Sequence, residues 1–162
     1  MTDNRPDAVV LERTLAAPPE RVWELWTVPE HFEAWYGPDG ATIHVATMDV
    51  RVGGDRLVEM RMPTPDDEMS MWFGGEHREV SPALRLAYSE AMTDASGRTL
   101  AAEEAGLPSG HPVLTEVTVE LAAVDAGTHL TLTHAGIPAD SPGATGWAMA
   151  LDKLVAALEG DG

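Results

Sequence analysis

The histidine at position 134 is the side chain in this sequence best suited to acid–base or binding chemistry. It follows Leu130 and Leu132 at intervals of two residues, with threonines between them. Alternate side chains of a strand share a face, so His134 is expected to point inward with the two leucines. There its imidazole could serve as an acid, a base or a hydrogen-bond donor to a ligand. The alternative interpretation is a structural histidine satisfied by a neighbouring backbone carbonyl.

A group of methionines flanks the loop at residues 63–67, with two on each side at a spacing of two. They are Met60, Met62, Met69 and Met71. Phe73 shares the alternation of the second pair, whereas Trp72 has the opposite parity and is expected at the surface or at a partner contact. Because methionine is unbranched and polarizable, these residues suit an adaptable apolar pocket. Ordinary core packing explains them equally well, and both interpretations stand.

Tyr88 and three other residues complete the candidate ligand site. Tyr88 follows two leucines at alternating positions, so its ring is expected inside, where its hydroxyl needs a partner. His77 is a second candidate for proton transfer, and Trp147 and Leu151 lie four residues apart on the predicted last helix. The predicted cavity lining comprises Met60, Met62, Met69, Met71, Phe73, His77, Tyr88, His134, Trp147 and Leu151.

The remaining reactive side chains form no motif of known chemistry. The six histidines lack the His-x-x-x-His and His-Glu-x-x-His spacings, and the chain has no cysteine. We therefore expect no metal site and no disulfide. Glycine motifs for nucleotides and the Gly-x-Ser-x-Gly elbow are also absent, so no cofactor is expected. Four carboxylates are interpreted as solvated strand positions, namely Glu76, Glu79, Glu90 and Glu116.

Composition limits the classes of partner. The 162 residues include 27 acids against 10 lysines and arginines, a net charge of −17. This charge repels nucleic acid and anionic lipid, so neither is expected as a partner. No apolar run approaches the roughly 20 residues of a membrane span, and the amino terminus lacks the basic and apolar regions of a signal peptide. With cysteine absent as well, we expect a soluble, cytoplasmic protein without membrane insertion.

An α+β fold must position the candidate residues. Periodicity and turn residues predict strands at 8–15, 43–52, 56–62, 69–80, 84–88, 113–121 and 130–134. Pro18 and Pro19 mark a first short helix, a second covers 29–35, and Ser141 and Pro142 start a long last helix. Residues 91–111 are predicted as an excursion between strands, with one helical turn at 101–105. A single domain is expected over 8–159, with flexible termini at 1–7 and 160–162.

Five short motifs resemble one known family. They lie at 17–23 (Ala-Pro-Pro-Glu-Arg-Val-Trp), 34–38 (Ala-Trp-Tyr-Gly-Pro), 49–54 (Asp-Val-Arg-Val-Gly-Gly), 127–138 and 146–154. On these motifs the chain is identified as a member of the activator of Hsp90 ATPase homologue 1-like family, within the START-like or Bet v 1-like superfamily. The resemblance implies a helix-grip fold, in which a curved antiparallel sheet wraps around a long carboxy-terminal helix. Aromatics at 35 and 36 would plug one end of the core, and glycines at 53 and 54 would permit a tight hairpin.

Three hypotheses for function follow. The leading one is binding of a small apolar or amphipathic molecule between the sheet and the last helix. The second is an enzyme of cyclase or hydrolase type that uses His134 with Tyr88 or His77, although we favour a role without catalysis. The third is a protein-interaction or stress-response module. The family's eukaryotic namesake carries an additional amino-terminal domain for chaperone contact, for which this chain has no room, so contact with Hsp90 is not expected. Edge strands and exposed aromatics permit a homodimer.

Overall fold

The computed structural model describes residues 8–37, 40–101, 103–104, 113–137 and 142–159. The order of its elements is β1 (Ala8–Leu15), α1 (Pro19–Thr27), α2 (Pro29–Glu33), β2 (Thr42–Met48), β3 (Asp55–Pro63), β4 (Glu68–Ser81), β5 (Arg85–Thr93), β6 (Thr115–Val124), β7 (Gly127–Ala135) and α3 (Pro142–Glu159). The predicted order of one strand, two short helices, six strands and a long helix is confirmed. The predicted cap at Ser141 and both predicted flexible termini lie outside the described residues.

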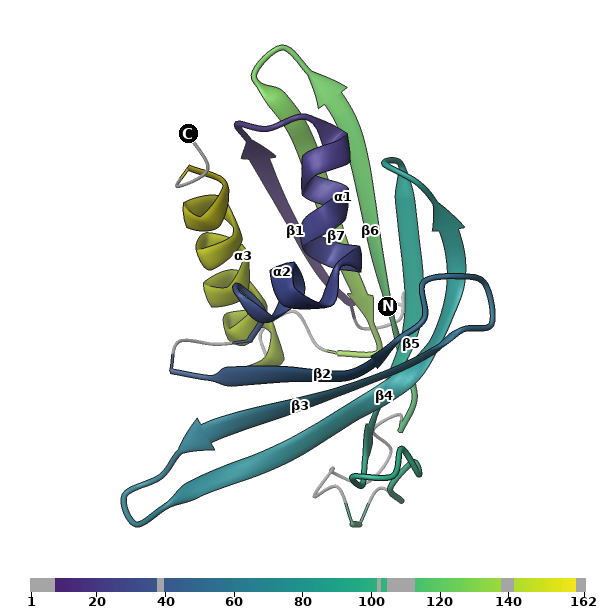
Figure 1. Cartoon of the computed structure of the whole chain (residues 1–162), viewed down its shortest axis with the longest axis vertical. Coiled ribbons are helices and arrows are strands. Elements are labelled where there is room, and N and C mark those ends of the chain that lie inside the picture. The colour runs from purple at the N-terminus through teal and green to yellow at the C-terminus, as the bar shows by residue number, and fades with distance from the viewer. Residues whose placement is uncertain (1–7, 38–39, 102, 105–112, 138–141, 160–162) are drawn as a thin grey trace, which may run out of the picture.

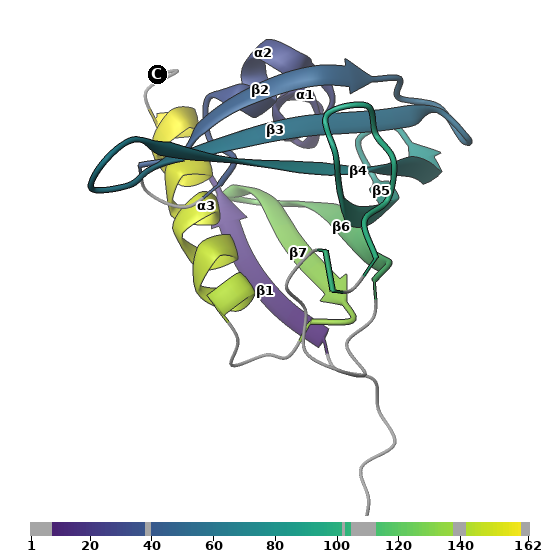
Figure 2. The same ribbon diagram turned by 90° about the horizontal axis from the view of Figure 1, so that it is seen from below.

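A single antiparallel sheet contains these strands in the order β1-β7-β6-β5-β4-β3-β2. The sheet curves so strongly that β2, β3 and β4 face β1 and β7 across the interior, with α3 beside the opening between them (Figures 1 and 2). Leu151, Leu154 and Leu158 lie along α3 and are buried. The architecture is the predicted one, because a sheet that buries one face needs a long apolar helix to cover it.

The two short helices begin at prolines, as the sequence predicts. Pro18 precedes α1 in an extended conformation and Pro19 is its first residue, where the missing N–H costs no intrahelical bond. Val22, Leu25 and Trp26 form the buried stripe of α1, while Trp23 stays partly exposed. The helices therefore deliver apolar side chains to the interior just before β2.

The hairpin between β2 and β3 confirms the predicted role of its glycines. Gly53 has φ +83°, a conformation that glycine adopts without strain. A Cβ on Gly54 would stand 2.1 Å from the carbonyl oxygen of Asp49. The turn then joins β4, because the Gly53 N–H donates to the His77 carbonyl and the His77 N–H donates to the Gly54 carbonyl. The side chain of His77 therefore lies against this turn, with its Nδ1 3.3 Å from the Gly54 carbonyl oxygen.

The strand predicted at 84–88 is longer in the structure. It continues to Thr93, because Met92 still pairs with Phe73 of β4. The chain then folds back at once, and Thr99 forms a bridge with Thr93. The helical turn predicted at 101–105 falls partly outside the described residues. The excursion is thus more ordered at its start than the sequence interpretation assumed.

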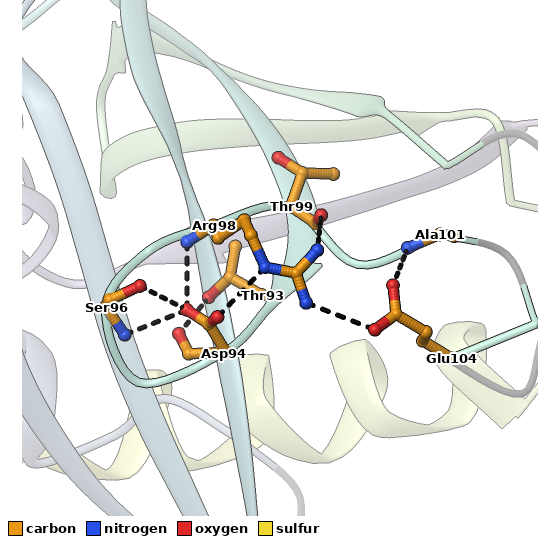
Figure 3. Close-up of polar contacts among 7 residues, drawn as sticks. All are labelled: Thr93, Asp94, Ser96, Arg98, Thr99, Ala101 and Glu104. Atoms are coloured by element: carbon orange, nitrogen blue, oxygen red, sulfur yellow. Dashed lines mark hydrogen bonds and ion pairs between the residues drawn. The ribbon is translucent and has the colours of Figure 1, made fainter.

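Asp94 organises the turn that follows β5 (Figure 3). One of its carboxylate oxygens accepts bonds from the backbone N–H groups of Ser96 and Arg98 and from the Ser96 hydroxyl. The Arg98 guanidinium contacts the other oxygen at 3.2 Å and reaches Glu104 at 3.1 Å. The hydroxyl of Ser96, followed by the backbone of Arg98, lowers the pKa of Asp94 to about 2. Polar side chains therefore close this turn without an apolar core.

Within the described residues, no helix combines the length and the apolarity that crossing a bilayer requires.

Candidate functional site

Aromatic rings fill the interior between the sheet and α3. They come from α1, from α2 and the residues that follow it, and from α3 itself. The centroids of Trp26 and Trp35 lie 4.6 Å apart, and those of Phe32 and Tyr36 lie 4.5 Å apart. Trp147 of α3 joins them at 6.1 Å from Trp26 and 5.5 Å from Tyr36. The Trp35 indole donates to the Leu25 carbonyl at 2.7 Å, which fixes its orientation. These contacts confirm that aromatics plug this end of the core.

Arg56 is the buried charge at the centre of the site. It is 2% exposed and shares the inward face of β3 with Val58 and Met60. The guanidinium carbon lies 4.0 Å from the centroid of the Tyr88 ring and 5.1 Å from that of Phe32. Aromatic faces attract a cation in this arrangement. Burial lowers the pKa of Arg56, but its electrostatic interactions with Tyr88, Glu90 and Tyr36 together raise it above the ordinary value, so the group stays charged.

Glu90 is the counterion of Arg56, which corrects the prediction that it is solvated. It is 7% exposed, and its Oε2 lies 3.5 Å from Nη1 of Arg56. The Tyr36 hydroxyl also donates to this oxygen at 3.4 Å. Glu90 projects from β5 and Arg56 from β3, the two strands on either side of β4. At this level β4 carries Gly75, which pairs with Arg56, so no side chain of β4 separates the two charges.

Within the part of the chain that the structure describes, several buried side-chain atoms of this interior have no hydrogen-bond partner. They are both terminal nitrogens of Arg56, the hydroxyl of Tyr88 and the indole nitrogen of Trp26. The Glu90 contact with Arg56 is an ion pair without hydrogen-bond geometry. Burial is the main cause that raises the pKa of Tyr88, so its hydroxyl stays protonated. Because buried polar groups are nearly always paired, an unpartnered cluster of this kind needs a physical explanation.

His134 lies in the interior as predicted, and both of its ring nitrogens are engaged. The Trp147 indole donates to Nδ1 at 2.9 Å, and Nε2 lies 2.8 Å from the Thr115 hydroxyl. Thr115 in turn donates to the Glu90 carbonyl at 3.0 Å. An indole only donates, so Nδ1 must be the acceptor and Nε2 must carry the proton. Burial lowers the pKa of His134, which favours this neutral form. The histidine joins α3 to the sheet, as a structural histidine would, but its partners are side chains and not the backbone carbonyl of the alternative interpretation.

His77 also lies inside the protein. It is 1% exposed, its ring centroid lies 6.2 Å from that of Tyr88, and its Nδ1 lies 3.3 Å from the Gly54 carbonyl. Burial is the first cause that lowers its pKa, followed by the charge of Arg56. His77 therefore holds the hairpin turn between β2 and β3 against β4.

The methionines form cross-strand pairs between β3 and β4. Met60 pairs with Met71 and Met62 pairs with Met69. Met60 is 7% exposed and belongs to the core, whereas Met69 is 49% exposed near the end of the hairpin. Met62, Met71 and Phe73 are partly buried against the core. The structure thus brings four of these five side chains to the interior and leaves Met69 outside it.

Two more predicted lining residues come from α3. Trp147 is 6% exposed and Leu151 is fully buried. Trp72, which was predicted at the surface or at a partner contact, is half-buried on the other parity of β4. A surface pocket of about 320 Å³ is lined in part by Arg78, Ser89 and Thr115, and by none of the ten predicted lining residues. Thr115 is thus shared between this pocket and the hydrogen-bonded chain of His134.

The sequence interpretation missed two residues of the site, Arg56 and Glu90. A signal was present in each case, because each alternates with inward apolar residues on its own strand. Because both side chains are charged, we expected them to be exposed to solvent. The sequence of neither strand indicates that the two side chains meet across β4. No group of three or more histidine, aspartate or glutamate side chains that could hold a metal ion occurs in the described part of the chain.

The fold and the site define a class of protein. A curved antiparallel sheet closed by a carboxy-terminal helix, with two short helices after the first strand, is the helix-grip fold of the START-like superfamily. The model of the family described as Activator of Hsp90 ATPase homolog 1-like protein matches residues 16–159. The chain therefore belongs to this family.

Solved structures of bacterial proteins share the fold. A protein from Chromobacterium violaceum is 27% identical, with a TM-score of 0.75 over 95% of this chain and 99% of that one. A Silicibacter pomeroyi protein that carries the family's name is 20% identical, with a TM-score of 0.70 over 96% and 99% of the two chains. A Staphylococcus epidermidis protein is also 20% identical, with a TM-score of 0.75 over 98% and 93%. No curated protein matches the sequence.

Proposed function

We propose that this protein binds a small apolar or amphipathic molecule between the sheet and α3, in contact with Arg56 and Tyr88. One observation carries the proposal, namely the unpartnered donors of these two residues in an aromatic interior. Ligand sites combine a mostly apolar wall with a few convergent polar groups. Each buried donor without a partner lowers the stability of the folded state. Packing alone therefore does not explain why these donors are present, whereas a bound ligand would.

The methionine pairs support an approach route to these donors. They form a series along one face of the hairpin, from Met69 at the exposed end, through Met62 and then Met60 with Met71, toward Arg56. Methionine has three rotatable bonds and repacks readily, so such a wall can accommodate an incoming molecule. We therefore propose Met60, Met62 and Met71 as lining residues and Met69 as the outer end of the series.

Binding is favoured over proton-transfer chemistry. His134, the strongest sequence candidate for an acid or base, uses both ring nitrogens in hydrogen bonds to Trp147 and Thr115. Releasing Nδ1 would break the link between α3 and the sheet, and releasing Nε2 would break the side-chain contact between β7 and β6. We propose a cytoplasmic location from the absence of cysteine.

The neutral fluorophore N-phenyl-1-naphthylamine tests this function directly. The protein is first unfolded and refolded to remove co-purified molecules, and binding is followed by probe fluorescence and native mass spectrometry. We expect saturable binding of one molecule per chain. Met60→Phe should weaken it several-fold by narrowing the lining, while Leu84→Phe, at a position that is 64% exposed and outside the methionine series, should bind like the wild type. Absence of saturable binding, or equal effects of the two variants, would contradict the proposal.

A further inference from the structure

The unpartnered atoms of the interior share one chemical property. Arginine and tryptophan side chains are donors only, and neither has a lone pair to offer a ligand. The protonated Tyr88 hydroxyl is available as a donor as well. A ligand that suits this site must therefore accept hydrogen bonds, for example through an oxygen atom that has free lone pairs.

The charge in the interior is already balanced. Arg56 carries the positive charge and Glu90 lies 3.5 Å away as its counterion. Glu90 is in turn held by the Tyr36 hydroxyl, so it cannot turn away without breaking that bond. A second carboxylate beside Arg56 would bury an excess negative charge, which is strongly unfavourable in a low-dielectric interior. The chain's net charge of −17 further repels anions on their approach.

The position of the donors fits one acceptor atom. The guanidinium lies over the Tyr88 ring at 4.0 Å, so both groups occupy the same small region of the interior. Their surroundings are the rings of Phe32 and Tyr36 and the apolar face of β3. A carbonyl oxygen has two lone pairs and can accept from both groups at once.

On the function proposed above, we infer that the ligand is a neutral carbonyl compound with an apolar body, whose carbonyl oxygen accepts hydrogen bonds from Arg56 and Tyr88. Glu90 then acts as a specificity determinant, because its charge excludes carboxylic acids of the same shape.

Three naphthalenes of matched size separate shape from acceptor chemistry. They are 2-acetylnaphthalene, 2-naphthoate and 2-isopropylnaphthalene, each titrated by calorimetry into ligand-free protein. We expect the ketone to bind about tenfold more tightly than the isopropyl compound, because a hydrogen bond from a charged donor is worth at least one order of magnitude in affinity. The carboxylate should bind most weakly of the three.

Substitutions assign this preference to particular groups. Tyr88→Phe should reduce the ketone's advantage several-fold and leave affinity for the isopropyl compound unchanged. It should also move the infrared carbonyl stretch of the bound ketone back toward its value in an apolar solvent. Leu84→Ala, at a surface position that is 64% exposed, should leave that frequency unchanged. Glu90→Gln removes the counterion of Arg56. The affinity of the variant for 2-naphthoate should therefore be about tenfold higher than that of the wild type, because the carboxylate can pair with the guanidinium.

The outcomes distinguish this inference from the function on which it rests. Equal binding of the ketone and the isopropyl compound would overturn the inference and leave apolar binding intact. Tightest binding of 2-naphthoate by the wild type would overturn the role of Glu90 in the same way. Failure of all three compounds to bind would overturn both proposals. If Glu90→Gln does not fold, the infrared comparison of wild type with Tyr88→Phe still decides the case.

Discussion

Removing the Tyr88 hydroxyl is expected to stabilise the ligand-free protein. Tyr88 is 1% exposed and its hydroxyl has no partner, so its burial carries a desolvation penalty without compensation. That penalty is about 1–3 kcal/mol for a buried polar group. The phenyl ring of Tyr88→Phe keeps the contact with Arg56, whose guanidinium carbon lies 4.0 Å from the ring centroid. We therefore expect the free energy of unfolding to rise by about 1 kcal/mol, the lower end of that range.

Tyr36→Phe is the matched control, because it deletes the same atom from a hydroxyl that has a partner. The Tyr36 hydroxyl donates to Glu90 at 3.4 Å. Hydrogen bonds to charged groups contribute about 1.5–3 kcal/mol, and the length of this one favours about 1 kcal/mol. The two variants should thus change stability in opposite directions, although each loses one oxygen.

Urea unfolding followed by tryptophan fluorescence measures both changes, and thermal unfolding provides a second readout. At this chain length, 1 kcal/mol corresponds to a shift of about 2–4 °C in Tm. The protein must be refolded from denaturant before the measurement, since a co-purified ligand would stabilise the wild type selectively. A loss of stability in Tyr88→Phe equal to that in Tyr36→Phe would refute the reasoning, because it would mean that the Tyr88 hydroxyl has a partner in solution.

Three further predictions concern buried charge, pH and backbone packing. Glu90→Leu should cost about 3–5 kcal/mol in urea unfolding by leaving Arg56 without a counterion, whereas the double variant Arg56→Met/Glu90→Leu should regain most of that loss; additive effects would contradict the pairing. Because burial lowers the pKa of His134, the unfolded chain binds its proton more readily. Stability should therefore fall as the pH drops below about 6.5, and His134→Gln should flatten this dependence; parallel pH profiles would exclude His134 as its source. Gly75→Ala should destabilise the protein by about 1–3 kcal/mol, since its Cβ would lie 2.0 Å from a backbone oxygen of the neighbouring strand. The control Gly146→Ala meets no atom within 4 Å in α3, and should instead gain about 0.5–1 kcal/mol; equal effects in thermal unfolding would refute the packing argument.

The fold was predictable because the alternation of apolar residues and the positions of proline and glycine indicate its strands, helices and turns locally. Alternation along each strand gave the inward faces of β5 and β7, so Tyr88 and His134 were placed correctly from the sequence. The prolines at 18 and 19 and the glycines at 53 and 54 marked the ends of elements for stereochemical reasons that hold in any protein.

The polar centre of the site was less accessible to sequence reasoning. Arg56 and Glu90 are 34 positions apart in numbering and meet across β4, at a position where β4 carries Gly75. No local pattern encodes such a meeting, and an isolated charge on a strand is usually solvated. Met69 was predicted inside the cavity but is 49% exposed. The alternation of a strand predicts which face a side chain is on, but not where along the hairpin that face becomes exposed to solvent.

The pairing of the first strand with the last has a consequence for how this protein is made. Ala8 pairs with Ala135 and Leu15 pairs with Thr128, so two short helices and five strands separate the two partners. β1 cannot join the sheet until residues 127–135 have been synthesised, and α3 follows only afterwards. Contacts between such distant segments slow folding, since the chain entropy must be lost before the contacts form. On the ribosome, the apolar side of β1 therefore remains uncovered until residues 127–135 have emerged, and during this interval the nascent chain is exposed to aggregation.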